Sequence, residues 1–253
     1  MYQKHSLAIC AILIIFLFFI SKEESSGENI KIRVLFIGNS LTSVNDLPHS
    51  IAELAKSRNF YMEYDVYAPG GYKLSQHAID PLVLKKINQG TWDFVVLQEQ
   101  SQLPAFSQEQ VKTEVYPYAK KLSQLIRTAN PRTRIAFYMT MAKKNGNSGA
   151  YEEMQRRINA SYINMAQQNQ GLLVPVGLVW ENVHLKRPSL DLYIDDTHPN
   201  STGTYLTACV FYAILFKDSP IGLPYPKQID ENIAGFLQKI TDDTVTSKSW
   251  DWE

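Results

Sequence analysis

The stretch KIRVLFIGNSLT (residues 31–42) decides how this chain folds. Its first seven residues, Lys31 to Ile37, are rich in apolar and β-branched side chains, which is typical of a buried strand. Gly38 follows directly and allows a tight turn, because it carries no side chain. We therefore expect the Ser40 hydroxyl group to stand at the carboxyl end of this strand.

Beyond this stretch, short apolar runs alternate with longer helical patterns along the chain. The sequence predicts further strands at residues 61–68, 94–97, 134–139 and 172–174. It predicts helices at residues 47–59, 74–88, 108–128, 151–169, 202–216 and 228–240, with Gly171 as a cap. This alternation predicts one parallel sheet with helices on both faces. Ligands of such sheets bind beyond the carboxyl ends of the strands.

The N-terminus has the character of an export signal. Residues 7–20 (LAICAILIIFLFFI) are unbroken apolar and follow Lys4 and His5. As a helix they reach about 21 Å, short of the roughly 30 Å hydrocarbon core of a bilayer. We therefore assign residues 1–29 to a signal peptide with a polar lead-in, and residues 30–253 to one domain. We expect export to the periplasm or the extracellular space, with an uncleaved membrane anchor as the alternative.

Charge and cysteine content exclude several kinds of function. Lys plus Arg and Asp plus Glu both number 25, so the formal net charge is zero and nothing favours a nucleic-acid partner. The two cysteines are Cys10, in the export segment, and Cys209. A mature chain with one cysteine has neither an internal disulfide nor a cysteine metal cluster. Cys209 lies in an apolar helical pattern and is expected to be buried.

A second polar motif, DDTHP (residues 195–199), precedes the last strongly apolar helix. On a helical or turn-like segment, three-residue spacing places the side chains of Asp195 and His198 on one side. The carboxylate then accepts from one imidazole nitrogen and leaves the other free to accept a proton, as a serine general base requires. The alternatives are a solvated, helix-capping loop and a metal site, which lacks a further histidine at ligand spacing.

Together, Gly38-Asn39-Ser40-Leu41-Thr42 and Asp195-x-x-His198-Pro199 resemble the SGNH/GDSL hydrolases, over roughly residues 31–216. The resemblance implies a flavodoxin-like, three-layer α/β/α fold with about five parallel strands. It implies Ser40 as the nucleophile, His198 as the general base and Asp195 as the orienting acid. This chemistry needs no cofactor and no metal.

The same resemblance implies an oxyanion hole. Gly70 and Gly71 occupy the place of a glycine whose N–H helps to hold the oxyanion; we favour Gly71, acting with the N–H of Ser40. The asparagine of the family's third motif is missing after the strand at residues 94–97. The segment resembles a glutamine-bearing branch of the superfamily, in which we favour Gln98 as the amide donor, with Gln100 as the alternative.

Other polar and aromatic residues have two interpretations each. His77 either faces the site or lies on the surface or behind the site. Glu99 either tunes the site or, as we expect, is an exposed loop carboxylate. Tyr67, Tyr72 and Trp180 either line a sugar-accepting cleft or pack in the core, which is the usual place of aromatic residues.

These observations predict a serine esterase that hydrolyses short acyl esters, chiefly O-acetyl esters of carbohydrate. The carbohydrate is inferred by analogy alone. The expected substrate is a small-molecule or polysaccharide ester, and a membrane is a partner only if the N-terminal segment is an uncleaved anchor. Two alternatives remain: an acyltransferase to sugar hydroxyls on the same fold, and a catalytically silent envelope or carbohydrate-binding protein.

Overall fold

The computed structural model describes residues 30–144, 150–247 and 250–251. The export segment predicted at residues 1–29 lies outside the described residues. Among the described helices, none combines the length and the apolar character that crossing a membrane requires.

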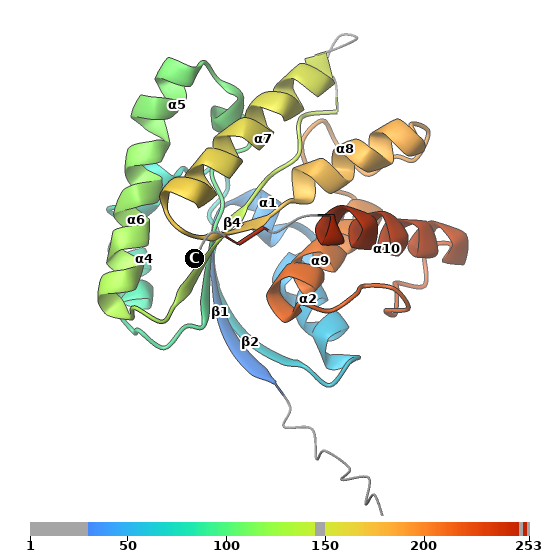
Figure 1. Cartoon of the computed structure of the whole chain (residues 1–253), viewed down its shortest axis with the longest axis horizontal. Helices are drawn as coiled ribbons and strands as arrows, with labels where there is room; N and C mark the ends of the chain where they lie inside the picture. Colours follow the sequence, from blue (N-terminus) through green and yellow to red (C-terminus); the bar gives the residue numbers. More distant parts are fainter. Residues whose placement is uncertain (1–29, 145–149, 248–249, 252–253) are drawn as a thin grey trace, which may run out of the picture.

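A parallel sheet of five strands forms the centre of the described chain (Figure 1). The strands are β1 (Lys31–Ile37), β2 (Tyr61–Tyr67), β3 (Phe94–Leu97), β4 (Arg134–Tyr138) and β5 (Leu172–Val174). Their order is β2-β1-β3-β4-β5, which is the flavodoxin-like order. Ile37, the last residue of β1, therefore pairs with Tyr67 on one side and Leu97 on the other. The loops that follow β1, β2 and β3 meet at this edge.

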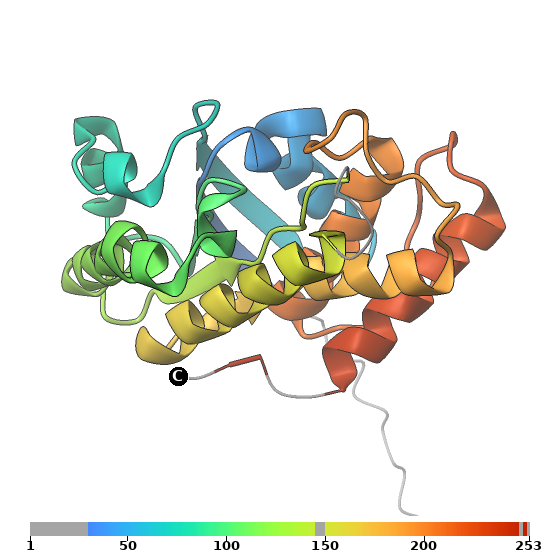
Figure 2. The same ribbon diagram turned by 90° about the horizontal axis from the view of Figure 1, so that it is seen from above.

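Helices cover both faces of the sheet, as Figures 1 and 2 show. One face carries α2 (Leu47–Lys56), α9 (Ser201–Phe216) and α10 (Glu231–Thr246), with α9 packed between the other two. The opposite face carries α4 (Pro81–Ile87), α6 (Tyr116–Ala129) and α7 (Ala150–Gln168). α8 (Val176–Lys186) contacts α7, α9 and α10. The predicted three-layer α/β/α fold is thus confirmed.

Burial explains why some elements lack an alternating or amphipathic pattern. Every residue of β3 is buried, because helices cover both of its faces. In α9 every residue from Gly203 to Leu215 is buried, so the helix is apolar on all sides. Cys209 lies in this helix, fully buried as predicted.

Prolines move several helix boundaries away from their predicted places. The helix predicted at residues 74–88 is two helices, α3 (Leu74–His77) and α4, because Asp80 caps α4 and Pro81 begins it. The helix predicted at residues 108–128 divides at Val115 into α5 (Gln108–Glu114) and α6, because Pro117 lies in the first turn of α6.

The remaining differences concern caps and one missed helix. α10 begins at Glu231, after Asp230 as its cap, and α8 was not predicted. Gln170, with φ of +46°, takes the left-handed position after α7 that was predicted for Gly171. Gly171 serves close packing instead, since a Cβ there would lie 2.9 Å from the carbonyl oxygen of Ile135.

Candidate active site

Ser40 stands where β1 passes into α1 (Ser40–Ser43). The turn needs Gly38, because a Cβ there would lie 2.4 Å from Thr42 Oγ1 and 2.6 Å from Gln98 Oε1. Asn39 caps α1, its Oδ1 accepting from the N–H of Leu41 at 3.2 Å. As the first residue of α1, Ser40 has an N–H without an intrahelical acceptor. Its hydroxyl and N–H therefore both lie at the carboxyl edge of the sheet.

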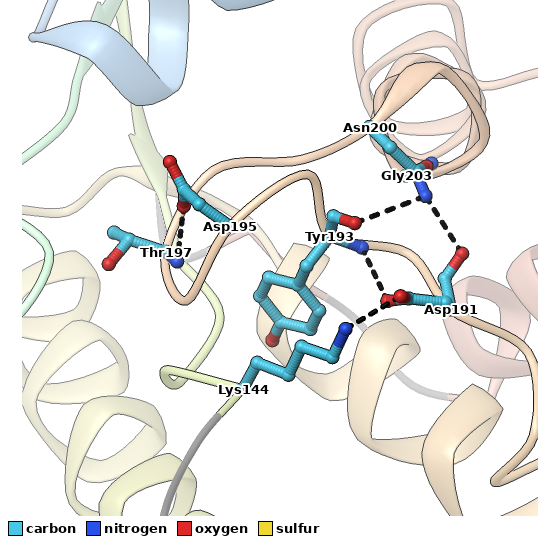
Figure 3. Close-up of polar contacts among 7 residues, drawn as sticks. All are labelled: Lys144, Asp191, Tyr193, Asp195, Thr197, Asn200 and Gly203. Atoms are coloured by element: carbon cyan, nitrogen blue, oxygen red, sulfur yellow. Dashed lines mark hydrogen bonds and ion pairs between the residues drawn. The ribbon is translucent and has the colours of Figure 1, made fainter.

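The segment before α9 folds into a closed loop (residues 191–200; Figure 3). The N–H of Ile194 donates to the carbonyl oxygen of His198 at 2.9 Å. Asn200 caps α9 with its Oδ1, which accepts from the N–H of Gly203 at 2.9 Å. Its Nδ2 donates back into the loop, to the carbonyl oxygens of Asp191 at 2.9 Å and Tyr193 at 3.4 Å. The loop is therefore held to the first turn of α9.

Lys144 holds the same loop from the segment after β4 (Figure 3). Its Nζ lies 2.6 Å from Asp191 Oδ2, and its N–H donates to the carbonyl oxygen of Asp196 at 2.9 Å. Tyr193 donates its hydroxyl to the carbonyl oxygen of Ala142 at 2.7 Å. The loop that carries Asp195 and His198 is thus fixed to two neighbouring parts of the chain.

The structure brings Ser40, His198 and Asp195 into one hydrogen-bonded series. Nε2 of His198 lies 2.9 Å from Ser40 Oγ, although 158 positions separate the two residues. Nδ1 of His198 lies 2.8 Å from Asp195 Oδ2. The carboxylate therefore holds the proton on Nδ1 and leaves Nε2 free to accept the serine proton. This is the geometry of a Ser-His-Asp triad.

Asp195 is held in its charged form by the loop itself. Its Oδ1 accepts from the N–H groups of His198 and Thr197, each at 2.7 Å. These two bonds, followed by the one from the His198 ring, lower the pKa of Asp195 to about 2. Asp195 therefore stays a carboxylate near neutral pH, although its side chain is exposed to solvent.

The glycine loop after β2 lies beside the nucleophile. Gly71 has φ of +71°, a conformation that favours glycine, and the N–H of Tyr72 closes the turn onto Pro69 at 3.2 Å. Asn39 Nδ2 donates to the carbonyl oxygen of Tyr72 at 2.9 Å and so ties this loop to the serine turn. Gly70 and Gly71 therefore lie where the resemblance places a donor to an oxyanion, and that role stays a prediction.

Gln98 is fully buried beneath the serine turn. Its Oε1 accepts from the N–H of Asn39 and from Thr42 Oγ1, both at 2.9 Å. Its Nε2 donates to the carbonyl oxygen of Glu99. These partners fix the orientation of the carboxamide, because only its oxygen can accept and only its NH₂ can donate. In this geometry Gln98 positions Ser40, and its predicted bond to an oxyanion requires the side chain to turn.

Gln100 has the less engaged NH₂ of the two glutamines. Its Oε1 accepts from the N–H groups of Gln102 at 2.8 Å and Leu103 at 3.0 Å. Its Nε2 has one long contact, 3.5 Å to Ser101 Oγ. Gln100, the alternative in the sequence prediction, therefore has an N–H group that is available to donate without rearrangement of the side chain.

Two buried ionisable groups support the site from below. His77 is fully buried and its Nε2 lies 2.8 Å from the carbonyl oxygen of Gly38, so it supports the serine turn. Burial lowers the pKa of His77, which keeps the ring neutral and makes Nε2 the donor. Glu99 was expected to be exposed, and that prediction is wrong: its side chain is fully buried.

Glu99 joins two loops of the site. Its Oε1 accepts from the N–H of Leu74, at the start of α3, at 3.1 Å, and from the N–H of Gln100 at 2.6 Å. Its Oε2 has no partner. Burial raises the pKa of Glu99 to about 7, and the two N–H bonds only partly oppose that effect. Nothing in the sequence indicates this burial, because a loop after a buried strand is usually solvated.

The three aromatic residues proposed for a sugar cleft have separate surroundings. Trp180 is buried in the core, in contact with Tyr193 at 4.8 Å between ring centroids, which is the place expected by default for an aromatic residue. Tyr67 and Tyr72 pack around the His77 ring. The Tyr67 hydroxyl donates to Asp80 at 2.7 Å, which raises the pKa of Tyr67 to about 12. The two tyrosines buttress the glycine loop.

Asn45 is a site residue that the sequence analysis missed. Its Nδ2 donates to the carbonyl oxygen of Pro199 and to Thr204 Oγ1, both at 2.9 Å. Asn45 and Asp46 are left-handed, with φ of +53° and +50°, a conformation that Asn and Asp tolerate better than other side chains. Asn45 thereby links the serine segment to the loop of His198. The feature of the sequence that could have indicated this left-handed turn is the Asn-Asp pair before the proline of α2.

Within residues 30–144, 150–247 and 250–251, no cluster of three or more His, Cys, Asp or Glu side chains is arranged to hold a metal ion.

Comparisons with known proteins give no sequence family but many similar structures. No family model matches the chain, and no curated protein matches it. A DUF4886 family protein from Bacteroides uniformis has 19% identity and a TM-score of 0.74, with 86% of this chain and 95% of that chain covered. An SGNH hydrolase candidate from Slackia heliotrinireducens has 25% identity and a TM-score of 0.61, covering 73% and 99%. An acetylxylan esterase from Geobacillus stearothermophilus has 15% identity and a TM-score of 0.51, covering 78% and 97%.

Proposed function

We propose, from the SGNH/GDSL-like fold that these comparisons show and from the triad geometry, that the protein is a serine esterase that removes short acyl groups, chiefly O-acetyl groups, from carbohydrate. The observation that carries this proposal is the series Asp195–His198–Ser40, with distances of 2.8 Å and 2.9 Å. The acetylxylan esterase among the similar structures supports the acetyl ester as substrate.

In the first half of the reaction, Ser40 Oγ attacks the ester carbonyl carbon while His198 Nε2 takes its proton. The N–H groups of Ser40 and Gly71 stabilise the oxyanion that forms, and one such donor contributes about 3 kcal/mol to transition-state stabilisation. When the tetrahedral intermediate collapses, the bond to the alcohol breaks and His198 returns the proton to the departing alcohol oxygen.

In the second half, water attacks the acyl-serine carbonyl carbon and His198 accepts a proton from that water. The bond to Ser40 Oγ then breaks, the proton returns to the serine, and the free acid leaves. Asp195 keeps the imidazole oriented and stabilises its cationic form in both halves. Every step uses the side chains of the triad, the backbone N–H groups of the oxyanion hole, the ester and water.

The decisive experiment compares Ser40→Ala with wild type on p-nitrophenyl acetate. We expect kcat to fall by on the order of 10⁴-fold or more, because the nucleophile is lost and only binding and oxyanion contacts remain. Ser43→Ala is the matched control, since Ser43 is an exposed serine in the same short helix. Equal turnover by Ser40→Ala and wild type would remove the proposal.

The natural reaction is tested with acetylated polysaccharides. Release of free acetate, absent in Ser40→Ala, is the result expected of a hydrolase. Acetyl groups recovered on an added sugar instead of in solution would make the protein an acyltransferase on the same triad.

The cellular location rests on the sequence alone. We propose export, because residues 7–20 have the length and composition of a signal-peptide core. N-terminal sequencing of the mature protein from the producing cells tests it: a first residue between 21 and 30 is expected, and a protein that retains Met1 in the cytoplasm contradicts it.

A further inference from the structure

A cleft of about 780 Å³ lies between α2, α9 and residues 224–228. Asn45 and Ser201 are among the residues that line it. Ser201 is three residues after His198, and Asn45 is bonded to the carbonyl oxygen of Pro199, the residue after His198. The cleft therefore begins on the histidine side of the triad.

The direction of the reaction gives this side of the site a specific use. His198 delivers its proton to the departing alcohol, so the alcohol part of the ester must lie on the side of His198. An acetyl group is far too small for a cleft of this volume. The space therefore suits the alcohol part of the substrate, provided that the proposed esterase function holds.

The lining of the cleft favours a neutral, hydroxyl-rich ligand. Glu53 and Lys56 both line it and carry opposite charges, so the walls do not select a phosphate or a carboxylate. No ion pair joins these two side chains, and both are exposed and free to bond with hydroxyl groups. Tyr225 offers a half-exposed ring, 38% accessible, beside Pro224 and Pro226. A flat apolar surface with polar groups around it matches the apolar face and hydroxyl rim of a sugar ring.

We propose that this cleft binds a neutral oligosaccharide, the sugar chain whose hydroxyl carries the acyl group, with Tyr225 as its stacking platform and Glu53 and Lys56 as partners of its hydroxyl groups. The inference rests on the proposed function. It adds where the glycan binds and that the glycan is uncharged.

The first test measures binding without turnover. Xylotetraose, cellotetraose and mannotetraose are titrated into the Ser40→Ala protein by calorimetry. At least one is expected to bind, and Tyr225→Ala in that background is expected to weaken the best ligand at least tenfold, whereas Tyr225→Phe keeps the ring and weakens it less than threefold. Tyr61→Ala is the control, because Tyr61 is an exposed tyrosine at the first residue of β2. Failure of all three sugars to bind, or equal binding by Tyr225→Ala, overturns the inference.

The second test separates this inference from the proposed function. The ratio of kcat/KM for monoacetylated tetraose to kcat/KM for p-nitrophenyl acetate is compared between wild type and Tyr225→Ala. We expect the ratio to fall at least tenfold, because only the first substrate carries a glycan. An unchanged ratio in an active enzyme overturns the cleft and leaves the esterase standing. If sugar binding depends on Tyr225 but the protein has no esterase activity, the glycan cleft stands and the esterase proposal is overturned.

Discussion

At the scale of single residues, the side chains around Ser40 divide into those that react in the proposed mechanism and those that hold these groups in place. Ser40, His198 and Asp195 form one hydrogen-bonded series, in which Asp195 also accepts from the backbone N–H of His198. Gln98, His77 and Glu99 are all buried and act on the backbone of the loops above them. Substitutions in the second group should therefore change stability and activity together.

Asp195→Asn should remove activity with little change of structure. The amide oxygen can still accept from the N–H groups of Thr197 and His198, which lie 2.7 Å from Oδ1. The amide NH₂ then faces His198 Nδ1 and forces it to accept, so the proton moves to Nε2 and the base is lost. We expect kcat to fall by on the order of 10⁴-fold. Steady-state kinetics measure the loss of activity, and a circular dichroism spectrum checks that the structure is unchanged. An active Asp195→Asn variant would contradict the assigned roles.

Glu99 should make the stability of the fold depend on pH. Its folded-state pKa of about 7 exceeds its ordinary value of 4.5, so the folded state binds its proton more tightly than the unfolded state. The contribution of the Glu99 carboxyl group to the free energy of unfolding is complete below pH 4.5 and is lost as the pH rises to about 7. The total loss is on the order of 3 kcal/mol. Glu99→Gln should lose less stability than wild type over this window.

Glu99→Gln keeps an oxygen for the N–H groups of Leu74 and Gln100, since both bonds end on Oε1. Denaturant midpoints at pH 4.5 and pH 7.5 measure the effect. Glu109→Gln, an exposed change in the first turn of α5, is the control. Identical pH dependence of wild type and Glu99→Gln would show that the buried carboxyl group does not titrate in this window.

At the scale of elements, the site depends on two tight junctions. The first is the passage from β1 to α1, where Gly38 lets Gln98 and Thr42 approach the backbone. The second is the passage from the loop of His198 into α9, where Asn200 serves both the helix and the loop. In each, one small or capping residue sets the position of a reacting side chain.

Gly38→Ala should impair both folding and catalysis. The new methyl group would overlap Thr42 Oγ1 and Gln98 Oε1, and one of the bonds beneath Ser40 must then lengthen. We expect a loss of about 1–3 kcal/mol in the free energy of unfolding, as for other overpacked sites. Gly70→Ala is a matched control in the neighbouring loop, since a Cβ there meets nothing within 4 Å. Urea denaturation of both variants measures the difference, and equal stability contradicts the packing argument.

Asn200 allows its two roles to be separated. Asn200→Ala removes the cap of α9 and should cost about 0.5–2 kcal/mol. Asn200→Asp keeps the capping oxygen but removes the donor to the carbonyl oxygens of Asp191 and Tyr193. The Asp variant should therefore be nearly as stable as wild type and yet have a lower kcat, because the loop of His198 is less well held. Wild-type kcat in Asn200→Asp would show that these donor bonds do not position His198.

At the scale of the whole molecule, one core joins the triad to the sheet. β1 and β3 are central, and Val34, Leu35 and Val95 are completely buried between the two helical layers. Ser40 thus lies just beyond a strand that is buried from Val34 to Ile37, whereas the loop of His198 is held by polar bonds nearer the surface. The base should be more mobile than the nucleophile.

Amide hydrogen exchange tests this difference. The amides of β3 and of residues 34–37 in β1 should exchange only through global unfolding, because these residues are buried in strands with a neighbour on each side. The amides of residues 194–198 should exchange orders of magnitude faster, with those of β2, an edge strand, in between. Equal protection of the loop and β1 would contradict this order of stability.

The sequence by itself determined the architecture and named the residues of the proposed triad. Alternation of apolar strands with longer helical patterns is a local property, so the parallel α/β fold and the bounds of β1 and β3 could be predicted. The two motifs that resemble the SGNH/GDSL hydrolases marked Ser40, Asp195 and His198, because each motif by itself is a short run of neighbouring residues.

Only the tertiary structure decided which groups surround those three residues. Gln98 supports the serine turn, Glu99 is buried, and Asn45 reaches Pro199 across 154 positions. Trp180, which the sequence left open to a cleft, lies in the core instead. The physical reason is that burial and hydrogen-bond partners come from segments that the fold brings together, and a side chain's own neighbours in sequence do not specify them.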